Sequence, residues 1–327
     1  MATDTETLRT DLAGIPLRAP VLLAAGTAGT LDEFRGVINL SRVGGLVTKS
    51  ITPEPRGGNT PWRVAPLKAG MLNAVGLANP GLDRFLADHA PRIADMPCPV
   101  VVSVAGFSVD DYVRTAGAIA DAGVAAAIEL NVSCPNVHGV EFGADPVLLA
   151  EVIAAVRAAA PDAKLFAKLP PAVVATPNSI VDLARAAIEP AASTSTGPTG
   201  RPGVDALTLC NTTPGMAIDV RTRRPKIGNV TGGLSGPAVH NAVVRLVHLA
   251  YTGIARDAET PIIGLGGVMA WDDAAELILA GASCVQIGTA LFADVRTPVK
   301  VARGLSKWAR SQGVSHIAEL VGEMRTE

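Results

Sequence analysis

The chain has 327 residues, a length within the range of one α/β barrel, and 48% of them are hydrophobic, which is ample for a large core. A formal net charge of -2 and a pI near 6.2 give no electrostatic reason to expect nucleic acid as a partner. Aromatic residues make up only 3% of the chain, so aliphatic side chains must fill the core.

The N-terminus and the cysteines indicate neither a membrane nor a metal site. The N-terminus is acidic and polar, without an apolar signal core, and no run approaches about 18 uninterrupted apolar residues. The cysteines form no Cys-x-x-Cys pair, which argues against zinc or an iron–sulfur cluster; they are Cys98, Cys134, Cys210 and Cys284. We expect a cytoplasmic protein with reduced thiols, no membrane contact and no bound metal.

Short β-branched runs alternate with Ala- and Leu-rich segments of helical period. Strands are expected over residues 21–25, 45–49, 100–104, 127–131, 165–169, 206–211, 262–266 and 284–288. Helices are expected over residues 32–40, 110–122, 146–159, 180–188, 237–251 and 271–280. Asp110 and Asp145 stand where a helix N-cap would, and Gly123 and Gly281 stand where a C-cap would.

Apolar strands that alternate with helices imply a parallel sheet covered on both faces. Eight such units predict a closed (β/α)8 TIM barrel, with residues 1–327 as a single domain. The alternative is an open doubly wound sheet. Against it, no Gly-x-Gly-x-x-Gly follows the first strand, and the glycine pairs come after the seventh and eighth strands, where barrels bind phosphate.

Polar or small residues stand at the ends of otherwise apolar strands. In a barrel these ends converge on one mouth, so we expect them to form a site. An unpaired amine or amide would be costly to bury there without a function. The residues concerned are Lys49, Ser103, Asn131, Lys168, Asn211, Thr212, Gly266 and Gly288.

The segment 191–203, AASTSTGPTGRPG, has the composition of a flexible loop. It joins a predicted helix to the sixth predicted strand, so it should lie at the face of the barrel away from the chemistry. We predict a flexible surface insertion there, and a partner-binding role stays open.

An ordered set of motifs across nearly the whole chain resembles dihydroorotate dehydrogenase, a flavin enzyme of pyrimidine synthesis. The motifs are TKS at 48–50, EPR at 54–56, MLNAVGLANPG at 71–81, NVSCPN at 131–136, AKL at 167–169, NT at 211–212, TGGLSGP at 231–237, IGLGGV at 263–268, and GAS at 281–283 through GT at 288–289. Cys134 in the position of the active-site base resembles class 1, and the TGGLSGP and EPR motifs resemble class 1B.

The resemblance implies oxidation of (S)-dihydroorotate to orotate with FMN as cofactor. Cys134 would take a proton from C5 while hydride passes from C6 to flavin N5, and Lys168 would stabilise charge near flavin N1. It also implies a homodimer core and a separate iron–sulfur/FAD subunit that passes electrons to NAD, with fumarate as an open alternative acceptor.

The same resemblance implies two sets of contacts, which share Lys49 and Asn131. The substrate contacts are Lys49, Asn73, Ala74, Val75, Gly76, Leu77, Asn131, Asn136, Asn211 and Thr212. The flavin contacts are Ala25, Gly26, Lys49, Ser50, Asn131, Lys168, Cys210, Gly236, Gly266, Gly267, Gly288 and Thr289, of which the last four would hold the phosphate through backbone N–H groups.

Two positions depart from the family pattern. Ala25 stands where relatives often carry serine, and Cys210 stands where an aliphatic residue is usual. The nearest alternative function is a flavin enzyme acting on dihydropyrimidines such as dihydrouracil, which shares the Asn-x-Ser-Cys-Pro loop. Further alternatives are a non-redox barrel that binds a sugar phosphate through the same glycines and a flavin subunit that serves as a scaffold.

Overall fold

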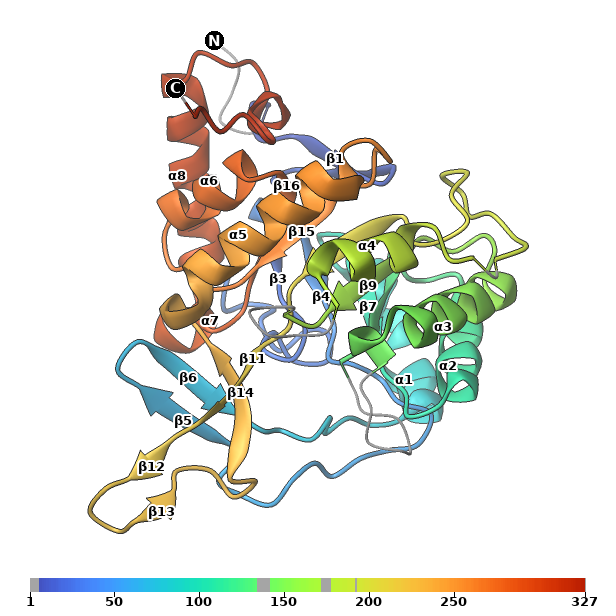
Figure 1. The fold of residues 1–327 in the computed structure, drawn as a ribbon, viewed down its shortest axis with the longest axis vertical. Helices are drawn as coiled ribbons and strands as arrows, with labels where there is room; N and C mark the ends of the chain where they lie inside the picture. The colour runs from blue at the N-terminus through green and yellow to red at the C-terminus, as the bar shows by residue number, and fades with distance from the viewer. Residues whose placement is uncertain (1–5, 134–141, 172–177, 192, 327) are drawn as a thin grey trace.

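Eight parallel strands close into a barrel in the order β10-β15-β16-β3-β4-β7-β8-β9, in a computed structural model that describes residues 6–133, 142–171, 178–191 and 193–326. The predicted (β/α)8 barrel is therefore confirmed (Figure 1). Each strand lies within two residues of its predicted bounds. The strands are β3 (Val21–Leu23), β4 (Gly45–Val47), β7 (Val100–Val104), β8 (Ala127–Asn131), β9 (Leu165–Leu169), β10 (Ala206–Leu209), β15 (Ile262–Leu265) and β16 (Ala282–Ile287).

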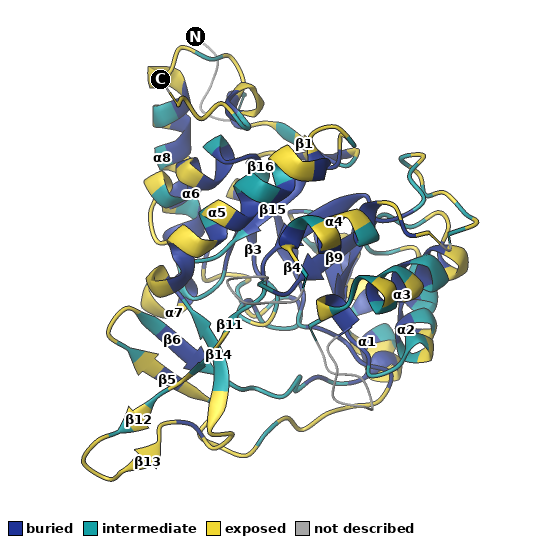
Figure 2. Cartoon of the chain, viewed as in Figure 1, coloured by how far each residue is buried: buried dark blue, intermediate teal, exposed yellow. Residues whose placement is uncertain are grey.

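The strands are buried on both faces, as their apolar composition requires (Figure 2). An N-terminal hairpin of β1 (Thr10–Leu12) and β2 (Ile15–Leu17) packs against the side chains that fill the inside of the barrel near the strand starts, among them Val47, Val101 and Phe166. The hairpin therefore closes the amino end of the barrel, which leaves the carboxyl end for a site.

Helices surround the barrel, and five of the six predicted helices are confirmed. These are α2 (Val109–Ala122), α3 (Pro146–Ala159), α4 (Ile180–Ile188), η4 (Pro237–Val239) continued by α5 (His240–Ala250), and α6 (Trp271–Leu279). The sequence reading missed α1 (Leu82–Asp88), α7 (Ala290–Ala293) and α8 (Thr297–Ser311). Shorter turns of helix are η1 (Leu40–Arg42), η2 (Ala90–Asp95), η3 (Phe142–Ala144), η5 (Tyr251–Ala255) and η6 (Ile317–Leu320).

Two of the four predicted caps are confirmed. Asp145 caps α3 by accepting from the N–H groups of Val147 and Leu148, and Gly123 ends α2 in the left-handed conformation with φ of 64°. The predicted N-cap of α2 was wrong, because the side chain of Ser108 is the N-cap and Asp110 lies in the first turn. Gly281 stands one position beyond the C-cap of α6, with φ of 122°.

The predicted helix over residues 32–40 is wrong, because this segment forms successive turns. Gly36 has φ of 84°, which an α-helix does not allow. The carboxylate of Glu33 accepts from the N–H groups of Thr30 and Leu31, so the side chain satisfies the backbone in a non-helical arrangement.

A four-stranded antiparallel sheet projects from the carboxyl end of the barrel (Figure 1). The sequence reading did not predict it. Its strands pair in the order β11 (Thr213–Met216), β14 (Thr231–Ser235), β6 (Gly70–Asn73) and β5 (Val64–Leu67), and a small pair, β12 (Ile218–Asp219) with β13 (Arg224–Pro225), extends it. The sheet brings two distant loops of the barrel together, and Asn73 donates to the carbonyl of Gly233 at 3.0 Å.

The segment 191–203 joins α4 to β10, and its described residues do not line the cavity at the carboxyl ends of the barrel strands. It is held against α3 and the start of β10: Arg157 donates to the carbonyl of Gly203, and Thr199 donates to the carboxylate of Asp205. Residue 192 lies outside the described residues, and the flexibility of the segment stays a prediction.

Within the part of the chain that the structure describes, no helix is both long enough and apolar enough to cross a membrane. The same described residues contain no cluster of three or more His, Cys, Asp or Glu side chains that could hold a metal ion.

Candidate active site

One cavity of about 570 Å³ opens at the carboxyl ends of the barrel strands, beneath the projecting sheet. Every predicted contact residue that the structure describes lines it, which brings together positions from Ala25 to Thr289. These residues are Ala25, Gly26, Lys49, Ser50, Asn73, Ala74, Val75, Gly76, Leu77, Asn131, Lys168, Cys210, Asn211, Thr212, Gly236, Gly266, Gly267, Gly288 and Thr289. Cys134 and Asn136 lie outside the described residues, although Ser133, the neighbour of Cys134 in sequence, lines the cavity.

The carboxamide of Asn131 lies at the centre of a chain of hydrogen bonds in this cavity. Its Nδ2 donates to Ser50 Oγ at 3.1 Å, and Ser50 Oγ lies 2.9 Å from Ser103 Oγ. Its Oδ1 accepts from Asn211 Nδ2 at 3.0 Å. Because both ends of the amide are engaged, the orientation of Asn131 is fixed, and the 9% of its surface that remains exposed faces the cavity in one defined way.

Two further asparagine side chains reach the cavity, one from the projecting sheet and one from the loop after β10. Asn73 is held by its bond to Gly233, and the side chain of Asn211 accepts from the N–H of Thr212 at 2.8 Å. The three asparagines thus lie on different elements but around one space. Such a set of fixed amides suits a small flat molecule that carries both hydrogen-bond donors and acceptors.

Two lysines bring positive charge to the cavity. Lys168 is the second-last residue of β9 and is only 6% exposed, and Lys49 follows β4 and is partly buried. A buried carboxylate lies one layer deeper in the barrel: Glu129 accepts from Thr208 and from Gln286, each at 2.9 Å, and Thr208 stands opposite Lys168 in the sheet register. A nearly buried ammonium that lines the cavity can stabilise negative charge that develops on a bound molecule.

Cys210 is the only described cysteine that lines the cavity, and the structure argues against chemistry at its sulfur. Burial raises the pKa of its thiol to about 12, and the charge of Lys168 lowers it only in part. The thiol is therefore neutral at physiological pH and cannot act as a base there. Its small side chain fills the cavity wall as an aliphatic residue would.

Glycines form the end of the cavity next to α5 and allow a bound group to approach the backbone closely. Gly236 and Gly267 have φ of 89° and 72°, which favour glycine. A Cβ on Gly266 would lie 2.5 Å from Val243, and one on Gly236 would lie 2.8 Å from the Cα of Gly70. Thr289 donates to Ser235 at 2.8 Å across the same end. The predicted glycine pairs therefore form one cradle at the start of a helix, which suits a phosphate.

Some residues of the cavity were not predicted as contacts. The guanidinium of Arg56 lies 4.6 Å from the ring centre of Phe107, and both side chains line the cavity. Arg56 occurs in the Glu-Pro-Arg motif, so that motif was the available signal. Gln286 also lines the cavity, but it stands within a run of strand residues, and only the alternation of the strand could have pointed to it.

Comparisons with known proteins agree with this geometry. A family model described as dihydroorotate dehydrogenase matches residues 7–308. The chain is 42% identical over 313 residues to the catalytic subunit of dihydroorotate dehydrogenase B (NAD(+)) of Desulforudis audaxviator, covering 95% of each chain. It is 40% identical over 319 residues to the subunit of the same name of Bacteroides thetaiotaomicron, covering 97% of this chain and 98% of the other.

A further relative carries a different name. The chain is 42% identical over 323 residues to a putative dihydroorotate dehydrogenase A (fumarate) of Solibacter usitatus, covering 98% of this chain and 99% of the other. All three names give dihydroorotate dehydrogenase, and they differ in the electron acceptor. The chain therefore belongs to the dihydroorotate dehydrogenase family, as a class 1 oxidoreductase that resembles the class 1B catalytic subunits.

Proposed function

We propose that the protein oxidises (S)-dihydroorotate to orotate in pyrimidine biosynthesis, with FMN bound in the cavity at the carboxyl end of the barrel. The observation that carries the proposal is the convergence of the described contact positions, from Ala25 to Thr289, on that one cavity. The volume of about 570 Å³ lies within the range of cofactor and ligand pockets. The glycine cradle fits the phosphate, and the fixed amides fit a planar ring system.

The chemistry requires a base and a hydride acceptor on opposite faces of the substrate ring. FMN held in the cavity would supply the acceptor for the hydride that leaves substrate C6. A base must remove the proton from C5, so that the two C–H bonds are replaced by the C5=C6 double bond of orotate. We assign this base to Cys134, because the pKa of a free thiol, about 8.5, is within reach of neutral pH if the site stabilises the thiolate.

The remaining residues bind the substrate and the cofactor and orient them. Orotate carries a carboxylate, two carbonyls and ring N–H groups, and we assign its recognition to Asn73, Asn131, Asn136 and Asn211 with Thr212. Lys49 would lie between substrate and cofactor, and Lys168 would stabilise the negative charge that the hydride acceptor gains. The hydrogen bonds of Asn73, Asn131 and Asn211 support these assignments, because each amide is already fixed before substrate binds.

Anaerobic reduction of the bound flavin by dihydroorotate tests the proposal. The purified protein should be yellow, and its flavin absorption should bleach with dihydroorotate but not with dihydrouracil. Cys134→Ala should keep bound FMN and lose reduction, while Cys98→Ala, a buried cysteine that does not line the cavity, should reduce normally. A colourless protein, or near-normal reduction in Cys134→Ala, would overturn the assignment.

We propose NAD as the final electron acceptor, reached through a separate iron–sulfur/FAD subunit. The names of the Desulforudis and Bacteroides relatives support this choice, and the Solibacter name supports fumarate as the alternative. The reduced chain should be reoxidised slowly by NAD alone and rapidly once the partner subunit is added. Rapid turnover with fumarate by the isolated chain would instead make it an enzyme of the fumarate type.

We also propose that the chain acts in the cytoplasm as the homodimeric core of such an assembly. Exposed apolar side chains on and near the projecting sheet support self-association, among them Trp62 at 78% and Val220 at 84% exposure. Light scattering of the isolated chain should give twice the monomer mass. A monomer at micromolar concentration would contradict the dimer.

A further inference from the structure

His240, the first residue of α5, makes hydrogen bonds through both ring nitrogens. Its Nδ1 lies 2.9 Å from the carbonyl oxygen of Gly266, and its Nε2 lies 2.9 Å from a carboxylate oxygen of Glu276 on α6. The histidine side chain is only 8% exposed, while that of Glu276 is 56% exposed. The ring therefore joins the end of β15 to α6 from a nearly buried position.

The partners determine the protonation state of this ring. A peptide carbonyl can only accept a hydrogen bond, so Nδ1 must carry a proton. An ionised carboxylate can also only accept, so Nε2 must carry a proton as well. A neutral imidazole has one N–H and could satisfy just one of these contacts. We propose that His240 is held as an imidazolium that positions the Gly266–Gly267 turn of the phosphate cradle, an inference that rests on the proposed FMN site.

Two carboxylates on α6 face this cation. Besides Glu276, Asp273 places an oxygen 4.0 Å from Nε2. The other oxygen of Asp273 accepts from the N–H groups of Met269 and Ala270, each at 2.8 Å, in the same loop that follows β15. The loop is thus held at its start by the histidine and at its end by the aspartate.

The position of the Gly266 carbonyl determines where the next N–H points. The carbonyl of Gly266 and the N–H of Gly267 belong to one planar trans peptide, in which the two bonds point in opposite directions. His240 does not line the cavity, whereas both glycines do. Anchoring the carbonyl on His240 therefore directs the N–H of Gly267 away from the histidine, as a phosphate-binding turn requires.

Close packing leaves this turn little freedom to adopt another orientation. A Cβ on Gly267 would lie 2.6 Å from the Cβ of His240 and 3.0 Å from the carbonyl oxygen of Gly236. His240 is therefore a positioning residue. It acts on the cofactor through the backbone of the turn and through its charge behind the cradle, without touching the cofactor itself.

Nitrogen NMR of protein labelled in its histidines tests the charge state directly. The chain has five histidines, and the His240 signals are identified as those lost in His240→Gln. At neutral pH both ring nitrogens of His240 should be protonated, with coupled N–H protons. A pyridine-type nitrogen at His240 would overturn the imidazolium, and this measurement does not depend on FMN.

FMN binding to the apoprotein tests the positioning role, with riboflavin as the probe that lacks the phosphate. His240→Gln should weaken FMN binding roughly tenfold, because a charge-assisted contact is lost, and leave riboflavin binding unchanged. His248→Gln, a partly exposed histidine on the same helix, is the matched control and should bind both as the wild type does. Equal weakening of FMN and riboflavin in His240→Gln, or no weakening of either, would overturn the role.

Glu276→Gln provides a second variant in case His240→Gln does not fold. It keeps an acceptor for Nε2 and removes the charge at a largely exposed position. FMN binding should weaken by roughly threefold, again without change for riboflavin. Full FMN affinity in Glu276→Gln, together with a neutral His240 in its spectrum, would show that the cation does not act on the cradle. Failure of the wild type to bind FMN would instead refute the proposed function and leave the NMR result standing.

Discussion

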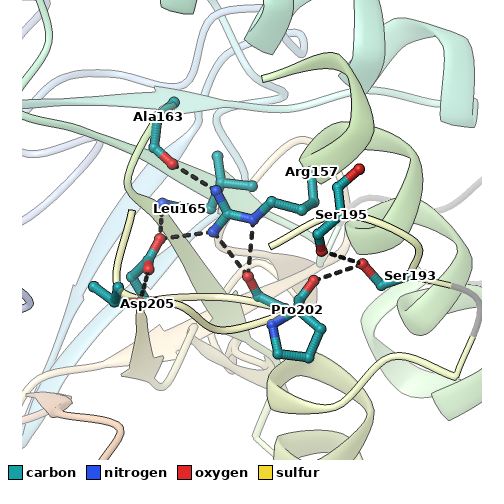
Figure 3. A network of polar contacts seen from close by, with 9 residues as sticks. Arg157, Ala163, Leu165, Ser193, Ser195, Pro202 and Asp205 are labelled. Carbon is teal, nitrogen blue, oxygen red and sulfur yellow. Dashed lines mark hydrogen bonds and ion pairs between the residues drawn. The ribbon is translucent and has the colours of Figure 1, made fainter. Parts of the chain in front are cut away.

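Arg157 on α3 and Asp205 at the start of β10 form an ion pair of 2.7 Å in which both side chains are completely buried. Further bonds satisfy the remaining polar atoms: Arg157 donates to the carbonyls of Gly203 and Ala163, and Asp205 accepts from the N–H of Leu165 (Figure 3). The pair therefore joins a surface helix, two barrel strands and the segment 191–203 at the amino end of the barrel.

Removal of Arg157 should destabilise the fold. Arg157→Met leaves a buried carboxylate without its cation, and we expect a loss of about 3–5 kcal/mol in the free energy of unfolding. Urea unfolding followed by circular dichroism measures it. Arg84→Met, which removes an exposed ion pair with Asp88, should change the value by less than about 0.5 kcal/mol. Adding Asp205→Asn to Arg157→Met should recover part of the loss, and no recovery would mean that the cost lies in packing.

The cysteines should differ sharply in reactivity. Burial raises the pKa of Cys98 to about 11 and that of Cys210 to about 12, and raises that of Cys284 further. Since the thiolate is the reactive form, these three should resist iodoacetamide in the native protein at pH 8. Mass spectrometry should find one fast label, at Cys134, which orotate suppresses. Rapid labelling of Cys210 would contradict the burial of its thiol.

The same thiols make stability fall in alkaline solution. A raised pKa in the folded state means that the folded chain keeps its protons while the unfolded chain loses them above about pH 9, so the free energy of unfolding decreases as pH rises. Each fully buried thiol contributes a slope of about 1.4 kcal/mol per pH unit in that window. Urea midpoints between pH 8 and 10.5 measure the slope, and Cys284→Ala should reduce it relative to the wild type.

The sequence predicted the barrel and most of its mouth because both follow from strand patterns. A strand of apolar residues that ends in Asn131 or Lys168 shows where the mouth lies without any knowledge of the loops. It was harder to predict where local turns would replace a helix. Residues 32–40 have a helical composition, yet Gly36 takes φ of 84°, which an α-helix does not allow.

The projecting sheet and the contacts that it creates could not be predicted from periodicity. Its strands are short and rich in glycine, and β6 pairs with β14 across about 160 residues of sequence. Arg56 lies in a loop without regular structure, so only folding shows that its guanidinium packs over Phe107. His240 lies at the start of a predicted helix, but its two acceptors come from a different strand and a different helix.

The cradle should not tolerate a side chain at Gly236. Gly236→Ala would force alanine to φ near 89° and place its Cβ 2.8 Å from the Cα of Gly70. We expect FMN affinity to fall by at least about tenfold, because the backbone must shift where the phosphate binds. Fluorescence titration of the apoprotein measures it. Gly313→Ala is the matched control, since Gly313 has φ of 76° and open space around it, and it should affect stability but not FMN affinity.

Lys168 should be needed for flavin reduction more than for flavin binding. Lys168→Met keeps most of the side-chain volume of a residue that is 6% exposed and removes the ammonium from the cavity. Hydride transfer adds negative charge to the acceptor ring. Loss of the Lys168 ammonium should therefore lower the rate of flavin reduction by about 10² or more, as for other preorganised charge-stabilising groups. Anaerobic stopped-flow measurement with saturating dihydroorotate gives this rate. Lys164→Met, just before the amino end of the same strand, removes a lysine that donates to the carbonyl of Gly14 and should leave the rate unchanged. Equal rates in Lys168→Met and the wild type would mean that the charge acts elsewhere.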